Sequence, residues 1–383
     1  MKGFSIGRPG AAIPVPWGFL GMLGLALAVE LWVARHHLDL APEYSAEWLK
    51  TNREARRQAR RNEIFCFGDS LVKVGVAPRV LEARLVEKHA YNLALSGGQP
   101  IASYYMLRHA LEAGGRPTAV LVDSKWSALA HQYTLNEPIL PDILGPRDIL
   151  DLAWTARDGR LAGSLFLAKV LPSYRVRFEA RADVRTALRG GTPPPRRSIG
   201  TWRRNWERNR GAHHVTRPAN TAIGVDPNNK LLLPDAWSPN PVVATYLERF
   251  FALAESRGIP VFWLVLPSVR EIQARHETNR IDRAFTEYAQ AVQQRFPNLV
   301  VIDGRSARYP ERVFLDPTHL ARDGAAAFTD DVATVLKRQL AGAGPSPRWE
   351  TLPAYRDRPI GVALEDIDTS ARIIAARGQN ARR

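Results

Sequence analysis

The chain has 383 residues, 45% of them hydrophobic, which allows one large domain or two ordinary ones with a substantial core. Its formal net charge is +15, carried mostly by arginine. Nucleic acid, anionic lipid headgroups or an acidic polymer would suit such a charge, although an arginine-rich composition alone produces it too. No nucleic-acid-binding module can be recognised, so we expect no nucleic-acid partner. The single cysteine, Cys66, excludes an internal disulfide and a cysteine-rich zinc site.

The N-terminal segment is strongly apolar. Residues 13–34 carry almost no polar side chain, and a helix of that length can span a bilayer. We therefore expect residues 1–35 to form an uncleaved single-pass membrane anchor. A removed signal peptide is the alternative, because Ala26-Leu27-Ala28 resembles a cleavage site. A buried helix of a soluble domain fits less well, because the segment is apolar on all faces.

The positive charges on the two sides of this segment favour opposite orientations in the membrane. Lys2 and Arg8 precede it and favour a cytoplasmic N-terminus, with the rest of the chain exported. Five arginines follow it and favour the reverse: Arg53, Arg56, Arg57, Arg60 and Arg61. We expect the domain that follows this segment to be extracytoplasmic.

The rest of the chain divides into regions of different pattern. Residues 36–61 are polar and predict a charged stalk, and residues 343–383 predict a basic tail without a core pattern. Between them, residues 62–342 alternate short apolar strands with amphipathic helices. Strands are expected at 64–67, 90–95, 119–122, 261–266 and 299–302, and helices at 76–88, 102–113, 241–256, 283–295 and 324–340. This alternation predicts an α/β fold in which helices cover a parallel sheet.

An insertion at about residues 151–235 interrupts the alternation. It is rich in arginine and predicts some helix with long loops. Trp202 and Trp206, with the arginines beside them, indicate either a basic aromatic surface for carbohydrate or packing into the core.

The motif Gly68-Asp69-Ser70 follows the first expected strand and begins a helix. A glycine permits a tight turn out of the strand, and the serine hydroxyl then lies at the carboxyl edge of the sheet, where open α/β sheets bind ligands. The N–H of Ser70 is free to point at an oxyanion. The same tripeptide is also a common helix cap, so the motif alone is a weak signal.

Asp316 and His319 lie in one loop between the last expected strand and the last helix. A serine hydroxyl needs a base to take its proton, and an imidazole base needs an acceptor that fixes its tautomer. Two residues separate the acid from the histidine, so both side chains can come from the same loop. The sequence therefore predicts a catalytic triad of Ser70, His319 and Asp316.

With these motifs the chain resembles the SGNH, or GDSL, hydrolase family, over about residues 62–130 and 240–342. The family carries Gly-Asp-Ser after its first strand and Asp-x-x-His before its last helix, matched here by Gly68-Asp69-Ser70 and by Asp316 and His319. The resemblance implies a flavodoxin-like three-layer α/β/α sheet and an oxyanion hole formed by the N–H groups of Ser70 and Gly97. It implies no cofactor and no metal.

One family element is missing. After the third strand the family usually has Gly-x-Asn-Asp, whose asparagine is a third oxyanion donor, and this chain has no asparagine there. Asn136, a few residues on, is a candidate replacement; losing one such donor costs a factor of ~10²–10³ in rate. This divergence also resembles membrane-tethered relatives that move acyl groups on envelope polymers. Further candidates for binding substrate are Asp69, Lys73 and Asp123, although Lys73 also fits an exposed helix position.

These observations predict a serine esterase or deacylase that acts on ester-linked acyl groups of a cell-envelope carbohydrate. An O-acyltransferase would use the same three residues, with a sugar hydroxyl in place of water. The rival from another class is a non-catalytic envelope protein that binds polysaccharide through its cleft and basic surface. The missing asparagine favours that rival, whereas the retention of all three triad residues opposes it.

Overall fold

The computed structural model describes residues 17–40, 43–191, 199–218, 221–230, 232–342 and 347–380. Residues 1–16 of the expected anchor, with Lys2 and Arg8, therefore lie outside the described residues, as do residues 192–198 of the insertion.

Six parallel strands form one sheet, which confirms the predicted α/β class. Their order is β2-β1-β3-β4-β5-β6. The strands are β1 (Ile64–Phe67), β2 (Ala90–Asn92), β3 (Ala119–Asp123), β4 (Val261–Val265), β5 (Leu299–Asp303) and β6 (Trp349–Thr351). The order reverses between β1 and β3, and doubly wound sheets bind ligands at the carboxyl ends of the strands that flank such a point.

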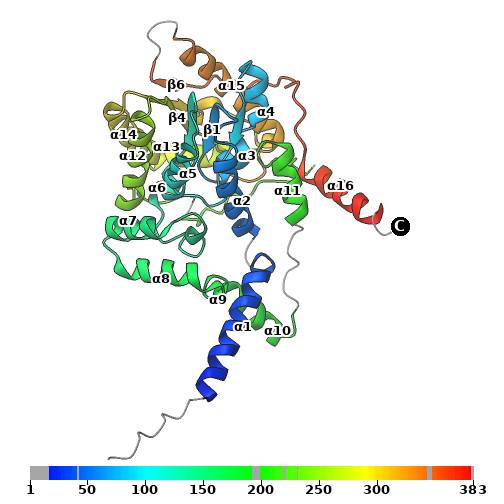
Figure 1. The fold of residues 1–383 in the computed structure, drawn as a ribbon. Coiled ribbons are helices and arrows are strands. Elements are labelled where there is room, and N and C mark those ends of the chain that lie inside the picture. Colours follow the sequence, from blue (N-terminus) through cyan, green and yellow to red (C-terminus); the bar gives the residue numbers. More distant parts are fainter. Residues whose placement is uncertain are drawn as a thin grey trace, which may run out of the picture.

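Helices cover both faces of the sheet because the strand side chains alternate between them (Figure 1). Phe65 and Phe67 pack on one face, whereas Ile64 and Cys66 pack on the other. The first face is covered by α2 (Glu43–Arg57), α5 (Pro100–Glu112), α12 (Pro241–Glu255) and α14 (Ile281–Arg295). The second is covered by α3 (Ser70–Gly75), α4 (Pro78–Arg84), α13 (Arg270–Thr278) and α15 (Arg322–Leu340).

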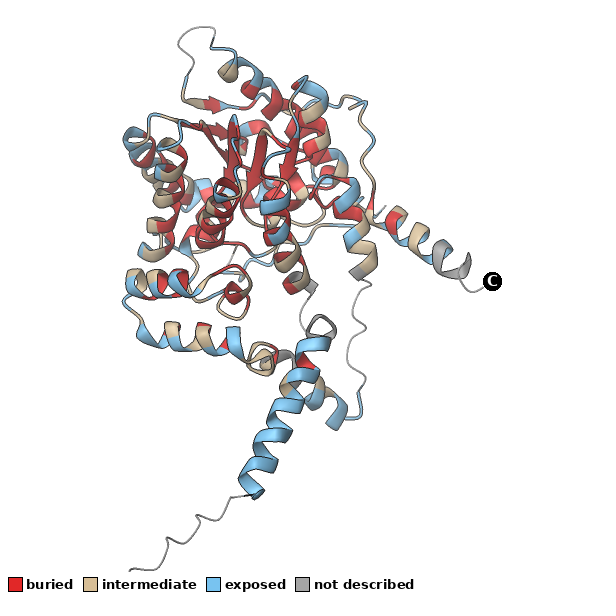
Figure 2. Cartoon of the chain, in the orientation of Figure 1, coloured by how far each residue is buried: buried red, intermediate tan, exposed pale blue. Residues whose placement is uncertain are grey.

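The N-terminal apolar segment forms α1 (Trp17–Leu40), which projects from the domain and is exposed along most of its length (Figure 2). Its stretch Trp17–Arg35 has a mean hydropathy of 1.7 and is long enough to cross a membrane; a signal sequence would have the same properties.

The segment expected to be a stalk is part of the folded domain. Helix α2 packs against α5, and its Trp48 side chain is fully buried in the core on that face of the sheet. Buried Asn52 on α2 also accepts a hydrogen bond from His109 Nδ1 on α5, at 2.9 Å. Arg53, Arg56 and Arg57 lie on the outer face of α2, whereas Glu47 and Glu54 are buried, and the many charges concealed the buried stripe in the sequence.

The insertion forms helices that attach to the domain at several points. They are α7 (Pro146–Ala156), α8 (Gly159–Val170), α9 (Pro172–Arg175), α10 (Arg177–Leu188) and α11 (Ile199–Arg208), preceded by α6 (Trp126–Ala130) and the 3-10 helix η1 (Leu140–Asp142). Trp206 is buried and Trp202 stacks on His213 with ring centroids 3.8 Å apart, so both tryptophans pack within the protein. After α11 the chain runs beside β2, where Asn92 N donates to Arg210 O at 2.8 Å.

The C-terminal region is also folded, unlike the expected tail. Strand β6 pairs with β5 in parallel, and α16 (Ile367–Asn380) packs against α11. The short 3-10 helices η2 (Arg305–Ala307) and η3 (Glu311–Val313) precede α15. A three-residue strand containing Glu350 has no apolar run, so the sequence pattern did not reveal it.

Candidate active site

The turn after β1 presents Ser70 at the carboxyl edge of the sheet. Gly68 has φ +133°, and a Cβ there would lie 3.1 Å from Asp123 O, so both the conformation and the space favour glycine. Asp69 caps α3 by accepting a hydrogen bond from Leu71 N at 2.7 Å. Ser70 is the first residue of that helix, so its N–H has no partner inside the helix.

The predicted triad residues lie in hydrogen-bonding contact. Ser70 Oγ is 2.7 Å from His319 Nε2, and His319 Nδ1 is 2.7 Å from Asp316 Oδ2. Because a carboxylate only accepts hydrogen bonds, Nδ1 carries the proton and Nε2 is left to accept the proton of Ser70. Residues 249 positions apart in the chain thus form the arrangement that activates a serine nucleophile.

Asp316 is held in its ionised form. Burial alone would raise its pKa, but the hydrogen bond from His319 Nδ1 and those from the N–H groups of Thr318 and His319 outweigh this and bring the pKa to about 2. The carboxylate is therefore charged across the neutral range and needs no change of protonation to support the imidazole.

The loop after β2 lies against the Ser70 turn. Leu95 N donates to Gly68 O at 3.0 Å, and a Cβ on Gly98 would lie 2.8 Å from Gly68 O, so the two backbones are in close contact. Gly97 has φ +67°, a left-handed conformation that favours glycine. This arrangement places Gly97 and Ser70 on neighbouring turns at the same edge of the sheet.

Helix α2 fixes that loop through contacts that the sequence did not reveal. Glu47 accepts hydrogen bonds from Ser96 N at 2.8 Å and from Ser96 Oγ at 2.7 Å, and Trp48 Nε1 donates to Ser96 O at 2.9 Å. Lys73 Nζ lies 3.5 Å from Glu47 Oε1 and donates to Ala94 O at 3.0 Å. Lys73 is thus buried between α2 and the loop, and burial lowers its pKa.

We expect Lys73→Met to lower the free energy of unfolding by about 3 kcal/mol, because removing one partner leaves the Glu47 carboxylate buried without its counter-charge. Chemical denaturation of the full-length protein measures this. The double variant Lys73→Met/Glu47→Gln should recover part of the loss. Lys50→Met is the matched control: its pair with Glu207 is half exposed, so the change should be about 1 kcal/mol or less. Equal losses for Lys73→Met and Lys50→Met would contradict the structural role of Lys73.

Asn136, the candidate for a third oxyanion donor, contacts the same loop. Its Nδ2 donates to Gly97 O at 3.0 Å and to Gln99 Oε1 at 3.3 Å. Both amide N–H groups are therefore used to hold the loop in this conformation.

Asp123 and Lys125 are two buried ionisable residues beside the turn that carries Ser70. Neither the Asp123 carboxyl oxygens nor Lys125 Nζ has a hydrogen-bond partner among the described residues. Burial raises the pKa of Asp123 well above its usual range, the nearby charge of Asp69 raises it further, and Lys125 opposes both. Burial likewise raises the pKa of Asp69, although the hydrogen bond from Leu71 N favours its carboxylate. Both burial and the neighbouring carboxylate therefore disfavour the ionised form of Asp123.

A groove with a volume of about 1040 Å³ lies beside the loop that holds Asp316 and His319, on the β4–β5 side. Ser268 and Val269 line it, and Val269 N donates to Pro317 O at 3.0 Å, so the groove adjoins the loop that holds Asp316 and His319. Arg270 and Arg305 also line it. Among the described residues, no three His, Cys, Asp or Glu side chains cluster as a metal site would require.

No protein-family model matches this chain, and no curated protein matches it. The functional assignment accordingly rests on the geometry of the site.

Proposed function

We propose that the protein is a serine hydrolase of the SGNH type, which cleaves ester-linked acyl groups from a cell-envelope carbohydrate. The observation that carries this proposal is the pair of 2.7 Å contacts from Ser70 to His319 and from His319 to Asp316. A binding protein has no need for this arrangement, since its effect is to make a hydroxyl nucleophilic.

In the proposed reaction, His319 Nε2 takes the proton of Ser70 as Oγ attacks the ester carbonyl carbon. The N–H groups of Ser70 and Gly97 stabilise the oxyanion, and His319 returns the proton to the departing alkoxide, which leaves an acyl-Ser70 ester. Water then gives a proton to His319 and attacks that ester. The tetrahedral intermediate collapses as the bond between Oγ and the carbonyl carbon breaks, and His319 gives its proton to Oγ, which releases the acid and restores the Ser70 hydroxyl.

Other candidate residues have separate roles in this proposal. Asn136 positions Gly97, because both of its amide N–H groups are already used there. Lys73 also positions the loop and is not assigned to substrate. Asp69 and Asp123 remain the substrate-binding candidates, and buried Lys125 joins them, because unpartnered polar groups at the switch point of a sheet are suited to a polar ligand.

The protein is proposed to be held at a membrane by α1 as a single-pass anchor, with the catalytic domain on the extracytoplasmic side. The length and hydropathy of Trp17–Arg35 support the anchor. An O-acyltransferase is the second candidate function, because a sugar hydroxyl can attack the acyl-Ser70 ester in place of water.

The deciding experiment is to incubate the full-length protein with an aryl acetate and with a fluorophosphonate probe. We expect release of the aryl alcohol, labelling of Ser70, and an acetylated protein detectable by intact mass spectrometry. Adding acylatable oligosaccharides then separates the two reactions: a hydrolase releases free acetate, whereas a transferase deposits the acetyl group on the sugar. A folded protein that neither reacts with the probe nor acquires acetyl would overturn the enzymatic assignment and favour a polysaccharide-binding protein.

A further inference from the structure

Exposed apolar side chains recur along the helices of the insertion, and α9 of that insertion packs against α1. Apart from Val86 and Leu135, every exposed large hydrophobic residue in the described chain lies on α1 or on α7–α10. We call the helices α7–α10 the platform. Its exposed large apolar side chains are Leu150, Trp154, Leu167, Val170, Val184 and Leu188. Trp154 is 87% exposed and Leu188 is 83% exposed, and large exposed apolar surfaces mark protein or membrane interaction sites.

The platform is attached to α1 at one position along that helix, Glu30. The Glu30 carboxylate of α1 accepts hydrogen bonds from Ser173 N, at 3.0 Å, and from Ser173 Oγ on α9. Val33 and Val176 are buried against each other next to this contact. Figure 1 shows α9 and α10 lying beside the C-terminal part of α1. The otherwise isolated acidic residue of the apolar stretch thus has its partner on the platform.

The contact between Glu30 and Ser173 lies near the end of the apolar span, at the depth where lipid headgroups meet acyl chains. Trp17–Arg35 has 19 residues and is about 28 Å long as a helix, close to the thickness of the hydrocarbon core. Glu30 precedes Arg35 by five residues, so Ser173 lies about 7.5 Å inside the end of the span. Helices that lie in a membrane interface bury their apolar faces about 5–10 Å deep.

Helix α10 has the side-chain pattern of an interfacial helix. Exposed Arg181, Arg185 and Arg189 follow one another at intervals of four residues, so they line one side of the helix. Val184 and Leu188 form the adjacent apolar stripe. Arginines beside an apolar stripe suit a surface of anionic lipid headgroups, into which the stripe inserts.

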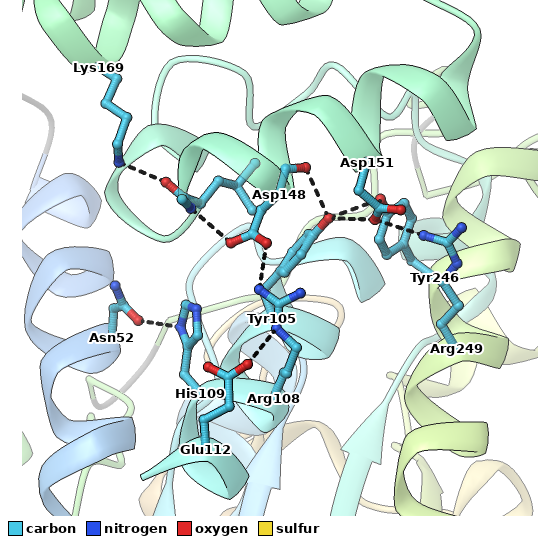
Figure 3. Close-up of polar contacts among 12 residues, drawn as sticks. Asn52, Tyr105, Arg108, His109, Glu112, Asp148, Asp151, Lys169, Tyr246 and Arg249 are labelled. Carbon is cyan, nitrogen blue, oxygen red and sulfur yellow. Dashed lines mark hydrogen bonds and ion pairs between the residues drawn. The ribbon is translucent and has the colours of Figure 1, made fainter.

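The platform is also joined firmly to the domain. Asp151 of α7 accepts hydrogen bonds from Tyr105, Tyr246 and Arg249, at 2.9–3.0 Å, and Asp148 pairs with Arg108 at 2.6 Å (Figure 3). A second attachment runs from α8 and α9 to η1. There Lys169 Nζ donates to Leu144 O at 2.7 Å, and Arg175 pairs with Asp142 at 2.6 Å.

The same attachment reaches the active site. Ser164 of α8 donates to Glu137, and the neighbouring Asn136 holds Gly97 through its 3.0 Å bond. The segment between Asn136 and Leu144 therefore connects the platform with the oxyanion loop.

We propose that α7–α10 bind an anionic phospholipid bilayer as an interfacial platform and hold the Ser70 site at the membrane surface. This inference rests on the proposed membrane anchor, because the height of the platform is set by α1. The site then meets acylated molecules that are themselves attached to the bilayer.

The test uses the full chain with one added cysteine at a time, labelled with an environment-sensitive fluorophore, in nanodiscs of phosphatidylcholine and phosphatidylglycerol. Cys66 is buried, and burial raises its thiol pKa, so label enters only the added cysteine. The platform variants are Trp154→Cys and Leu188→Cys. Val86→Cys, 79% exposed and outside both α1 and the platform, is the matched control, and Leu25→Cys probes the span itself.

We expect the labels at 154 and 188 to shift to the blue and to be quenched by lipids that carry a nitroxide near the headgroup. The label at 86 should be unaffected, and the label at 25 should be quenched by nitroxides deep in the acyl chain. Quenching at 25 with none at 154 or 188 would overturn the platform while leaving the anchor. Absence of quenching at 25 would overturn both. Fluorophosphonate labelling of the same samples reports the Ser70 chemistry separately, so its failure is distinguishable from either.

Discussion

Ser70→Ala is expected to lower the rate of ester hydrolysis by about 10⁶ and to abolish fluorophosphonate labelling, because the nucleophile and the acyl-enzyme are both lost. Any residual rate would come from the oxyanion hole and from substrate binding alone. Hydrolysis of an aryl acetate by equal amounts of folded wild type and variant measures the first effect, and gel fluorescence of the probe measures the second.

Ser256→Ala is the matched control for this change. Its hydroxyl only donates to Leu253 O at the end of α12, so activity and labelling should be unchanged. Full activity in Ser70→Ala would show that hydrolysis occurs elsewhere and would overturn the assignment of the nucleophile. Similar stability of the two variants would exclude unfolding as the cause of a loss.

Asp316→Asn is expected to reduce the rate by about 10⁴ while leaving the fold intact. An amide nitrogen can occupy the place of Asp316 Oδ2 and donate to His319 Nδ1, which moves the imidazole proton to Nε2. The ring can then no longer accept the proton of Ser70, although the side chains keep their positions. The wild-type carboxylate, with its pKa of about 2, stays ionised at neutral pH and keeps the proton on His319 Nδ1.

Asp323→Asn distinguishes a local effect from a general loss of negative charge. Asp323 lies in the first turn of α15, is mostly exposed and pairs only with neighbouring Arg322 among the contacts seen here. We expect the Asp323→Asn variant to hydrolyse the ester at a rate within a factor of about two of wild type, because an exposed ion pair contributes little. A loss of the same size in Asp323→Asn and Asp316→Asn would argue against a special role for Asp316.

The sequence predicted the parts of the molecule that depend on local pattern. The strands β1, β3, β4 and β5 are short apolar runs between turn residues, and they appear within one or two residues of their expected places. Gly68 and Ser70 were recognisable because a tight turn and a helix start impose residue types at fixed spacing. Asp316 and His319 were recognisable because both come from one loop.

The remaining features depend on contacts between distant segments. Glu47 and Trp48 hold Ser96 across 48 or 49 positions in the chain, and nothing in the charged sequence of α2 identifies that partner. Lys73 was expected to face solvent or substrate, whereas it is buried by α2 and by Trp206, whose ring centroid is 5.4 Å from its Nζ. No sequence pattern marks Lys125, because what distinguishes it is the burial of its Nζ without a hydrogen-bond partner among the described residues.

The two ends of the sheet bear on the behaviour of the protein at high local concentration. An open strand edge invites pairing with another copy and hence aggregation. Residues after α11 run beside β2 at one end of the sheet. At the other end the short β6 pairs with β5, so segments from the insertion and the C-terminal region shield β2 and β5. Molecules confined to two dimensions meet far more often than free ones. A chain cut before residue 347 would expose β5, and we expect it to self-associate more than the full chain when both are reconstituted in the same nanodiscs.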